Sequence, residues 1–336
     1  MDFEDPAPVG IRPVNGKARI DFTDAGPHYY RAMKVSVLIP VFNAEPHLAE
    51  CLESVLFQDF SDLEIIISND ASADGSARII ESFAQRDSRI RWWTNPQNLG
   101  EAGNSNVCLK SARGEYIKFI HADDKLLSAS AIRKMVEAIE AHPGASLVCC
   151  RQNFTRSQAG FKLEPRILSD KTGCFSGRRI IITCLERDAN LIGNPSHVLF
   201  RRSNAKRGFD ERFKRLVDYE MWFHLLEQGD CVYLAETLAT WRLHPKQQSA
   251  PVQGIEPQEG LWLVRSYYEK EWLRAAATPK MLFIQSRALK AKYGSSAMDV
   301  VKKLRASLGS ARFLLLWVDR KRSKINRWAG KVANRW

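Results

Sequence analysis

Between residues 35 and 150, short strand-like segments alternate with segments of helical periodicity. Most of the strand-like segments are largely apolar without strict alternation, as is typical of parallel strands that are buried on both faces. They are residues 35–40, 63–67, 89–94, 116–120 and 145–150. Apolar residues between them recur at helical spacing, for example Leu48, Leu52 and Val55. This alternation predicts an α/β fold with a mostly parallel sheet, right-handed crossovers and flanking helices.

The strand at residues 116–120 runs into His121 and two adjacent carboxylates, Asp123 and Asp124. Ligands of open α/β sheets bind at the carboxyl ends of the strands, so these side chains are candidates for a site. Neighbouring carboxylates repel each other unless a cation lies between them, and Mg²⁺ or Mn²⁺ takes oxygen ligands of this kind. The alternative is a turn and helix cap, because Asp favours both positions. This segment alone leaves both interpretations open.

The charge of the chain is concentrated near its C-terminus. Residues 1–250 hold 32 Lys and Arg against 32 Asp and Glu, whereas residues 251–336 hold 18 against 6 and supply the whole excess of +12. A neutral body with a basic tail is not typical of an enzyme that acts on nucleic acid, so we expect no nucleic-acid partner.

The cysteines and the apolar segments bear on the cellular compartment. Seven cysteines without a C-x-x-C pair argue against a zinc site or a disulfide framework and favour a reducing compartment. The N-terminus lacks the apolar segment of a secretory signal, and no run of about 18 apolar residues is present. These features predict a cytoplasmic protein.

Three regions follow from the patterns along the chain. Residues 1–32 are rich in proline and charge without periodicity, which predicts a loose extension. Residues 33–250 carry the α/β pattern, and residues 251–336 form a basic region of helical character. Tryptophans and other apolar residues are interleaved with eleven basic residues in 302–335, as in helices that lie on anionic membranes. The alternative is that this helix packs on the α/β domain with its charges solvated.

Six motifs follow one another in the α/β domain. They are VSVLIPVFN (35–43), EIIISNDASADGS (64–76), NLGEAGNSN (98–106), GEYIKFIHADD (114–124), DYEMWFHLL (218–226) and WRLH (241–244). In this order and spacing they resemble the family-2 inverting glycosyltransferases of bacterial surface-glycan type, over roughly residues 34–249. The resemblance implies a GT-A fold, in which a Rossmann-like sheet binds a nucleotide-diphosphate sugar with the help of a divalent metal.

The resemblance also implies a nucleotide site at the ends of the strands. Its residues are Pro40, Val41, Asn43, Asp70, Asn98, Gly100, Ala122 and Asp123. Asp70 matches the acid that accepts a hydrogen bond from the base, and the alternative is a turn-forming role. Asn98 has a helix cap as its alternative, and both of its roles are compatible.

The metal ligands implied by the resemblance are Asp123, His121 and His244, around Mn²⁺ or Mg²⁺. His121 stands where the family has the first acid of its D-x-D motif, and an imidazole supplies no negative charge. Ser105 stands at the position of an arginine, a strong diphosphate partner, which a nearby cation such as Lys125 would have to replace. His244 has a structural role as its alternative.

Asp218 matches the catalytic base of the family, and the alternative is an acid at a helix N-terminus that the helix dipole favours. An ordinary Asp has a pKa of about 4 and is a weak base. Val217 replaces the acid that commonly precedes it, which predicts an even less basic carboxylate. Asp124 and Trp222 are expected on the acceptor side, with core packing as the alternative for Trp222.

These residues predict an inverting glycosyltransferase that moves a sugar, expected from a UDP-sugar, to a hydroxyl of a saccharide or lipid-linked glycan. An acceptor in the membrane would give the basic tail a reason to bind the inner face of the membrane. A catalytically degenerate nucleotide-sugar-binding protein is the alternative, because His121, Ser105 and Val217 depart from the family pattern. A sugar-phosphate nucleotidylyltransferase is disfavoured, since residues 40–43 do not form its glycine-rich loop.

Overall fold

The computed structural model describes residues 10–14, 17–21, 33–156, 167–187, 189–243 and 256–276, with residues 290, 298–299, 301–302 and 306. The chain divides into two compact units. One comprises residues 1–177 and 192–250, and the other comprises residues 178–191 and 251–336. Residues 178–191 group with the C-terminal region rather than with the rest of residues 33–250. The division of the chain into an extension, an α/β domain and a basic C-terminal region stays a prediction.

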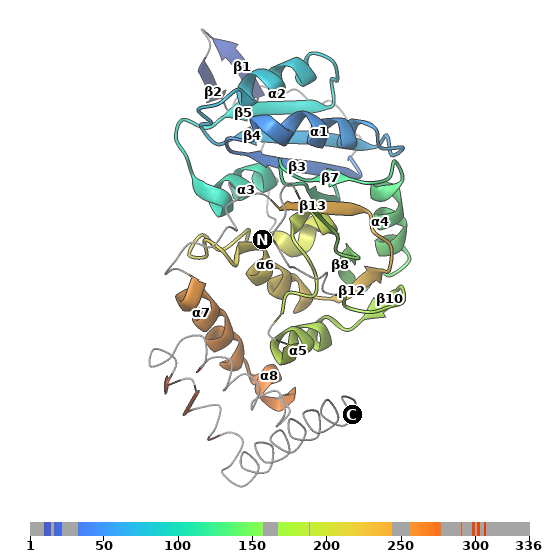
Figure 1. Cartoon of the computed structure of the whole chain (residues 1–336), viewed down its shortest axis with the longest axis vertical. Coiled ribbons are helices and arrows are strands. Elements are labelled where there is room, and N and C mark those ends of the chain that lie inside the picture. Colours follow the sequence, from blue (N-terminus) through green and yellow to red (C-terminus); the bar gives the residue numbers. More distant parts are fainter. Residues whose placement is uncertain are drawn as a thin grey trace, which may run out of the picture. The chain divides into compact units, whose positions relative to one another are not determined.

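An eight-stranded sheet forms the centre of the first unit (Figure 1). Its strands are β3 (Val35–Val41), β4 (Leu63–Asn69), β5 (Ile90–Thr94), β6 (Tyr116–Phe119), β8 (Ala145–Cys150), β10 (Gly173–Phe175), β11 (Val198–Arg201) and β12 (Asp230–Leu234). They lie in the order β10-β12-β8-β11-β6-β3-β4-β5. Only β10 and β11 run antiparallel to their neighbours in this sheet. The predicted mostly parallel α/β sheet is therefore confirmed.

The strand order reverses at β3. The chain proceeds from β3 to β4 and β5 on one side, and β6 then pairs with the other side of β3. All four strands are parallel, so the carboxyl ends of β3, β4 and β6 meet at one edge of the sheet. Such a reversal opens the crevice in which α/β proteins bind ligands, because the connecting helices leave to opposite faces.

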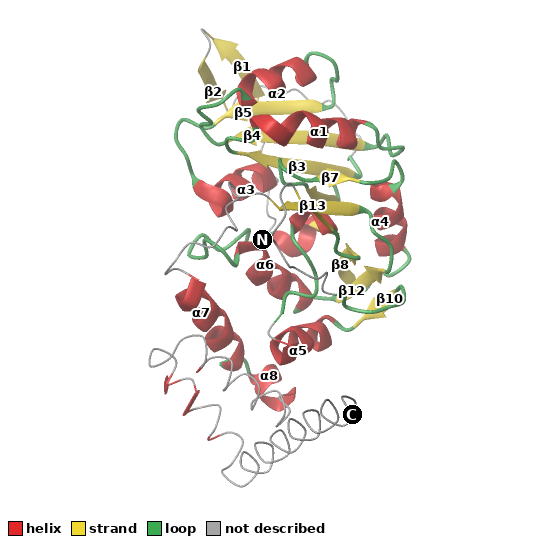
Figure 2. Cartoon of the chain, viewed as in Figure 1, coloured by secondary structure: helices red, strands yellow, loops and turns green. Residues whose placement is uncertain are grey.

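Helices cover the sheet and close its core (Figure 2). They are α1 (Glu45–Leu56), α2 (Ser76–Ala84), α3 (Gly100–Ser111), α4 (Ala131–Glu140) and α6 (Val217–Leu226). The contacts place α2 on β4 and β5, α3 on β3 and β4, and α4 on β8, β11 and β12. The apolar stripes of α1 and α4 are buried, as their helical spacing predicted.

A small second sheet lies beside the end of β6. Its strands are β7 (Lys125–Leu126), β13 (Ala239–Leu243) and β9 (Phe154–Arg156), with β13 in the middle. Strands of two and three residues carry too little pattern for β7 and β9 to be recognised in the sequence. Pairing of Thr240 with Lys125 brings the end of β13 next to the turn that follows β6.

The prediction of a loose extension at residues 1–32 is wrong for part of that segment. β1 (Gly10–Val14) and β2 (Lys17–Asp21) pair as an antiparallel hairpin. The two residues between them in the sequence are Asn15 and Gly16, the pair that best favours a two-residue hairpin connection. This signal was outweighed by the prolines that surround it.

The second unit contains α5 (Gly177–Arg187), α7 (Glu256–Tyr268) and α8 (Glu271–Ala276). The guanidinium of Arg178 lies 5.1 Å from the ring centre of Trp272, a cation–π contact between α5 and α8. Most of the basic segment 302–335 lies outside the described residues, so its membrane role stays a prediction. None of the helices in the described part of the chain combines the length and hydropathy needed to cross a bilayer.

Candidate active site

A cluster of three potential ligands follows β6 at the edge where the strand order reverses. One ligand atom each of His121, Asp123 and Asp124 lies within 4.8 Å of the others. Burial lowers the pKa of His121, which keeps its ring in the neutral form that binds metals. An imidazole nitrogen with carboxylate oxygens is a donor set that suits Mn²⁺. The side chains present therefore fit a divalent cation.

The two carboxylates of this cluster have different surroundings. Asp124 is 1% exposed, and its oxygens accept hydrogen bonds from the Asn194 amide (2.8 Å), the Ser196 hydroxyl (2.6 Å) and the Arg242 backbone N–H (2.8 Å). Burial, followed by the charge of Asp123, raises the pKa of Asp124, and a cation nearby would offset both effects. Asp124 thus ties the cluster to the fold, and its enclosure gives no support to the predicted contact with an acceptor.

Charged residues of β7, β13 and α1 surround the turn that follows β6. Arg242 donates from Nε to the backbone carbonyl of Asp123 at 2.9 Å and pairs through its other end with Glu50 of α1. Lys125 also pairs with Glu50, so this ammonium is engaged on α1 rather than free to replace a diphosphate-binding arginine. These partners lie up to 192 positions apart in the chain, which is why the sequence did not reveal them.

A network of buried hydrogen bonds also holds the turn that follows β6. The Ser196 hydroxyl accepts the His121 backbone N–H at 3.0 Å while it donates to Asp124. Lys118 is fully buried, and its ammonium donates to the carbonyls of Ser196 (2.5 Å) and Val198 (3.2 Å). Burial lowers the pKa of Lys118 to about 8. Ser196 lies in the short 3₁₀ helix η1 (Pro195–His197), which is thereby fixed against β6.

Asp70 lies at the end of β4 and caps helix α3 from outside it. Its carboxylate accepts hydrogen bonds from the backbone N–H groups of Leu99 (2.9 Å) and Gly100 (3.0 Å) and from the Asn95 amide (2.9 Å). Asn98 also caps α3, since its side-chain oxygen accepts the Gly100 N–H at 3.0 Å. Gly100 adopts a φ of +75°, which a residue with a side chain rarely tolerates. Contacts of Asp70 and Asn98 with a nucleotide stay predictions.

The remaining residues of the predicted nucleotide site lie along the same edge. Val41 is buried, and its carbonyl accepts the Asp70 N–H at 2.7 Å. Asn43 is exposed, with a φ of +49°, and its side chain accepts the Ala73 N–H at 2.9 Å. Pro40 is half-buried and Ala122 is buried. The structure thus brings the ends of β3, β4 and β6 together as expected.

Asp218 is the second residue of α6, and its carboxylate accepts the Tyr219 N–H at 2.7 Å. Burial raises the pKa of Asp218 to about 7, although part of the residue stays exposed. The expectation of a weakly basic carboxylate was therefore wrong: desolvation disfavours the charged form more than the N–H bond favours it.

The sequence also predicted Trp222 and His244 as site residues. Trp222 has no exposed surface, donates from its indole to the Gly193 carbonyl at 2.9 Å and packs against Phe200. The predicted acceptor contact of Trp222 is therefore not supported, and core packing is its observed role. His244 lies outside the described residues, so its part in metal binding stays a prediction.

The sequence profile of glycosyl transferase family 2 matches residues 36–208, just over half of the chain. The chain belongs to glycosyl transferase family 2. The motif-based prediction of the family is thereby confirmed.

Curated relatives share parts of this chain. EpsJ, an uncharacterized glycosyltransferase of Bacillus subtilis, is 43% identical over 104 residues, which are 31% of this chain and 30% of EpsJ. A GalNAc(5)-diNAcBac-PP-undecaprenol beta-1,3-glucosyltransferase of Campylobacter jejuni is 36% identical over 136 residues, 39% of this chain and 44% of the relative. The chain therefore matches less than half the length of these two relatives.

Solved structures share the fold. TarS of S. aureus in complex with UDP-GlcNAc superposes with a TM-score of 0.59 at 16% identity, over 82% of this chain and 88% of that one. The mannosyltransferase PcManGT of Pyrobaculum calidifontis, in complex with GDP-Man and Mn²⁺, gives 0.53 at 16% identity, over 90% and 83%. At these identities the likeness shows the fold, which agrees with the predicted GT-A sheet.

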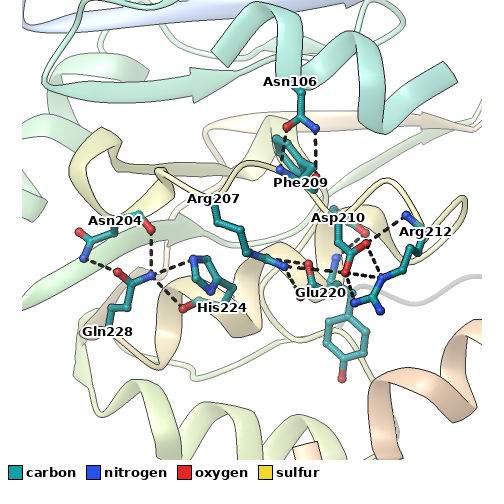
Figure 3. A network of polar contacts seen from close by, with 11 residues as sticks. Asn106, Asn204, Arg207, Phe209, Asp210, Arg212, Glu220, His224 and Gln228 are labelled. Carbon is teal, nitrogen blue, oxygen red and sulfur yellow. Dashed lines mark hydrogen bonds and ion pairs between the residues drawn. The ribbon is translucent and has the colours of Figure 1, made fainter. Parts of the chain in front are cut away.

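The family segment that begins at Asn98 ends in Asn106, and this residue anchors the loop before α6 (Figure 3). The Asn106 side chain accepts the Phe209 N–H at 2.7 Å and donates to the Phe209 carbonyl at 3.0 Å. Arg207 pairs with Glu220 of α6 through two bonds of 3.0 and 2.8 Å. The loop is thus fastened to α3 on one side and to α6 on the other, which fixes the start of the helix that carries Asp218.

Proposed function

We propose that this protein is an inverting glycosyltransferase that moves a sugar from a nucleotide-diphosphate donor, expected to be a UDP-sugar, to a hydroxyl of a saccharide or lipid-linked glycan. The observation that carries the proposal is the His121–Asp123 pair of potential metal ligands, placed where the strand order of a family-2 fold reverses. Further support comes from Asp218, whose raised pKa suits a general base at neutral pH.

The residues at the ends of β3, β4 and β6 would bind the donor. Asp123 and His121 would hold Mn²⁺ or Mg²⁺, and such an ion neutralises the charge of a leaving nucleoside diphosphate. The ends of β3 and β4 would receive the nucleoside, with Asn43 exposed at that edge. The complexes of TarS with UDP-GlcNAc and of PcManGT with GDP-Man and Mn²⁺ support a donor of this class.

Asp218 would activate the acceptor. Its carboxylate would take the proton of the acceptor hydroxyl as that oxygen attacks the anomeric carbon from the face opposite the diphosphate. A single displacement of this geometry inverts the anomeric centre. The partly buried carboxylate of Asp218 lies at the start of α6, and hydrogen bonds of Asn106 and Arg207 hold the loop before this helix. Such positioning is the main contribution of a base that acts late.

Transfer should depend on pH through Asp218. The base acts only when deprotonated, and burial raises its pKa to about 7. We therefore expect kcat/KM to rise tenfold per pH unit below about 7 and to level off above it. Initial rates measured from pH 5.5 to 8.5 at saturating metal check this, and a profile that is already flat at pH 5.5 would contradict it.

Nucleotide binding tests the proposal directly. Calorimetric titration with UDP, with and without Mn²⁺, should show binding that depends on the metal, and dTDP and GDP serve as competing candidates. Selective binding of dTDP or GDP would keep the enzyme class and change the donor. Metal-dependent UDP binding without turnover would favour the degenerate binding protein, which the departures at His121, Ser105 and Val217 motivate. The proposal would be refuted if the folded protein bound none of these nucleotides.

We also propose that residues 302–335 bind an anionic membrane surface at the cytoplasmic face, where a lipid-linked acceptor would be presented. Their eleven basic residues against one acid support this, since each contributes about 1 kcal/mol near such a surface. The name of the Campylobacter relative, which acts on an undecaprenol-linked glycan, supports an acceptor of this class. Full-length protein should co-sediment with vesicles containing anionic lipid, more weakly as salt increases, and a chain that ends at residue 310 should not. Equal sedimentation of both would exclude the idea.

A further inference from the structure

A carboxylate from another element lies beside the histidine of the ligand cluster. The Oε1 atom of Glu101 is 3.7 Å from Nε2 of His121, somewhat longer than a direct hydrogen bond. Both side chains are about three-quarters buried, with 25% and 26% of their surface exposed. Glu101 belongs to the first turn of α3, whereas His121 follows β6, so the fold rather than local sequence brings them together.

The position of Glu101 is built by the strand ends. Asp70, at the end of β4, accepts the N–H groups of Leu99 and Gly100 and so fixes where α3 begins. The φ of +75° at Gly100 turns the chain into the helix directly before Glu101. On the other side, the Ser196 hydroxyl accepts the backbone N–H of His121. Both partners of the pair therefore stand on anchored backbone.

The position of Glu101 bears on the negative charge of the metal site, which His121 reduces relative to a D-x-D motif. A D-x-D motif offers two negative charges to a cation, whereas His121 and Asp123 offer one. The carboxylate of Glu101 next to the imidazole restores the second charge. Histidines that ligate metals commonly present their other ring N–H to a carboxylate, which sets the tautomer and makes the ligand more basic.

We propose that Glu101 is a positioning residue of the metal site: it orients the His121 ring from its Nε2 side, leaves Nδ1 to face the cation, and supplies the charge that the histidine lacks. The inference rests on the proposed function and names one more residue of that site. It also assigns Asp70 a part in the site, because the cap that Asp70 provides sets the position of Glu101.

Binding of Mn²⁺ measures the effect without any turnover. Free Mn²⁺ is quantified by its electron paramagnetic resonance signal while protein with saturating UDP is titrated. Glu101→Gln keeps the shape of the side chain and removes its charge, and we expect it to weaken Mn²⁺ binding about tenfold, as for other carboxylates that support metal-bound histidines. Glu53→Gln, which changes an exposed acid of α1 outside the cluster, is the matched control and should bind like the wild type.

A second variant separates charge compensation from a purely structural role. His121→Asp combined with Glu101→Gln returns the negative charge to the first position of the motif, so Mn²⁺ affinity should recover to near the wild-type value. Weakened binding without recovery would overturn the charge role of Glu101, and so would a Glu101→Gln variant that binds like the wild type. If the wild-type protein with UDP bound no Mn²⁺ at all, the proposed function would fail first, and this inference with it.

Discussion

Replacement of Asp218 by asparagine is expected to reduce sugar transfer by about 10²–10⁴-fold, the usual contribution of a positioned general base. Asparagine has nearly the same shape and can still accept the Tyr219 N–H, so α6 should begin as before. It cannot take a proton from the acceptor. Donor binding should change little, because the predicted nucleotide and metal residues that the structure describes lie at the ends of β3, β4 and β6 and at the start of α3, not on α6. Steady-state rates together with UDP·Mn²⁺ titrations measure both quantities.

The stability of the same variant provides an independent check. The pKa of Asp218 is raised from about 4 to about 7 by folding, so the folded state holds this proton more tightly than the unfolded state does. Between these values stability must fall as the pH rises, since the unfolded chain binds fewer protons there. Asp218→Asn removes this loss. We expect it to unfold at a higher temperature than the wild type at pH 8 and at a similar one at pH 4.

A matched control and a contrary outcome complete this test. Glu227→Gln changes an acid at the other end of α6 and should leave transfer near the wild-type rate. If Asp218→Asn retained substantial transfer while Glu227→Gln behaved as expected, Asp218 would not be the base. A loss of transfer accompanied by lower stability at pH 8 would instead indicate that α6 itself had been disturbed.

Much of the fold was predictable because burial on both faces leaves a simple pattern. Strands β3, β4 and β8 are mostly apolar and almost continuously buried, and each lies within two residues of its predicted limits. The location of the site followed from the same pattern, since parallel strands place their carboxyl ends at one edge. The elements that were missed, such as β7 and β9, are too short to show any periodicity.

The roles of individual residues were harder to predict because they depend on distant partners. Asp123 and Asp124 are neighbours of one type, yet Asp124 is 1% exposed among donors from η1 and β13, whereas Asp123 is half-buried. The capping role of Asp70 depends on N–H groups about 30 positions away, and the pKa of Asp218 depends on burial that no local pattern records. Glu101 escaped notice for the same reason: its distance from His121 is set by the packing of α3.

The adjacent carboxylates Asp123 and Asp124 should respond differently to replacement by asparagine. Asp123→Asn should weaken Mn²⁺-dependent UDP binding more than about 100-fold, which exceeds the loss typical of a supporting residue, because it removes the charge of the predicted main ligand. Asp123 is half-buried, and its backbone carbonyl, which binds Arg242, is unchanged by the substitution. The variant should therefore fold with nearly wild-type stability. Calorimetry with UDP and Mn²⁺, and urea unfolding, measure the two properties.

Asp124→Asn is the control at the next position. Asp123→Asn should lose metal-dependent binding and keep its stability, whereas Asp124→Asn should lose stability and keep more of the binding. An amide nitrogen at Asp124 would face the donors of Asn194, Ser196 or Arg242, so a buried hydrogen bond is lost whichever way the amide is turned. Such a loss costs about 1–3 kcal/mol of unfolding free energy. If Asp124→Asn abolished metal-dependent binding without any loss of stability, while Asp123→Asn preserved binding, the assignment of ligand and anchor would have to be exchanged. Only the enclosure of Asp124 separates these outcomes, because the two side chains are chemically identical.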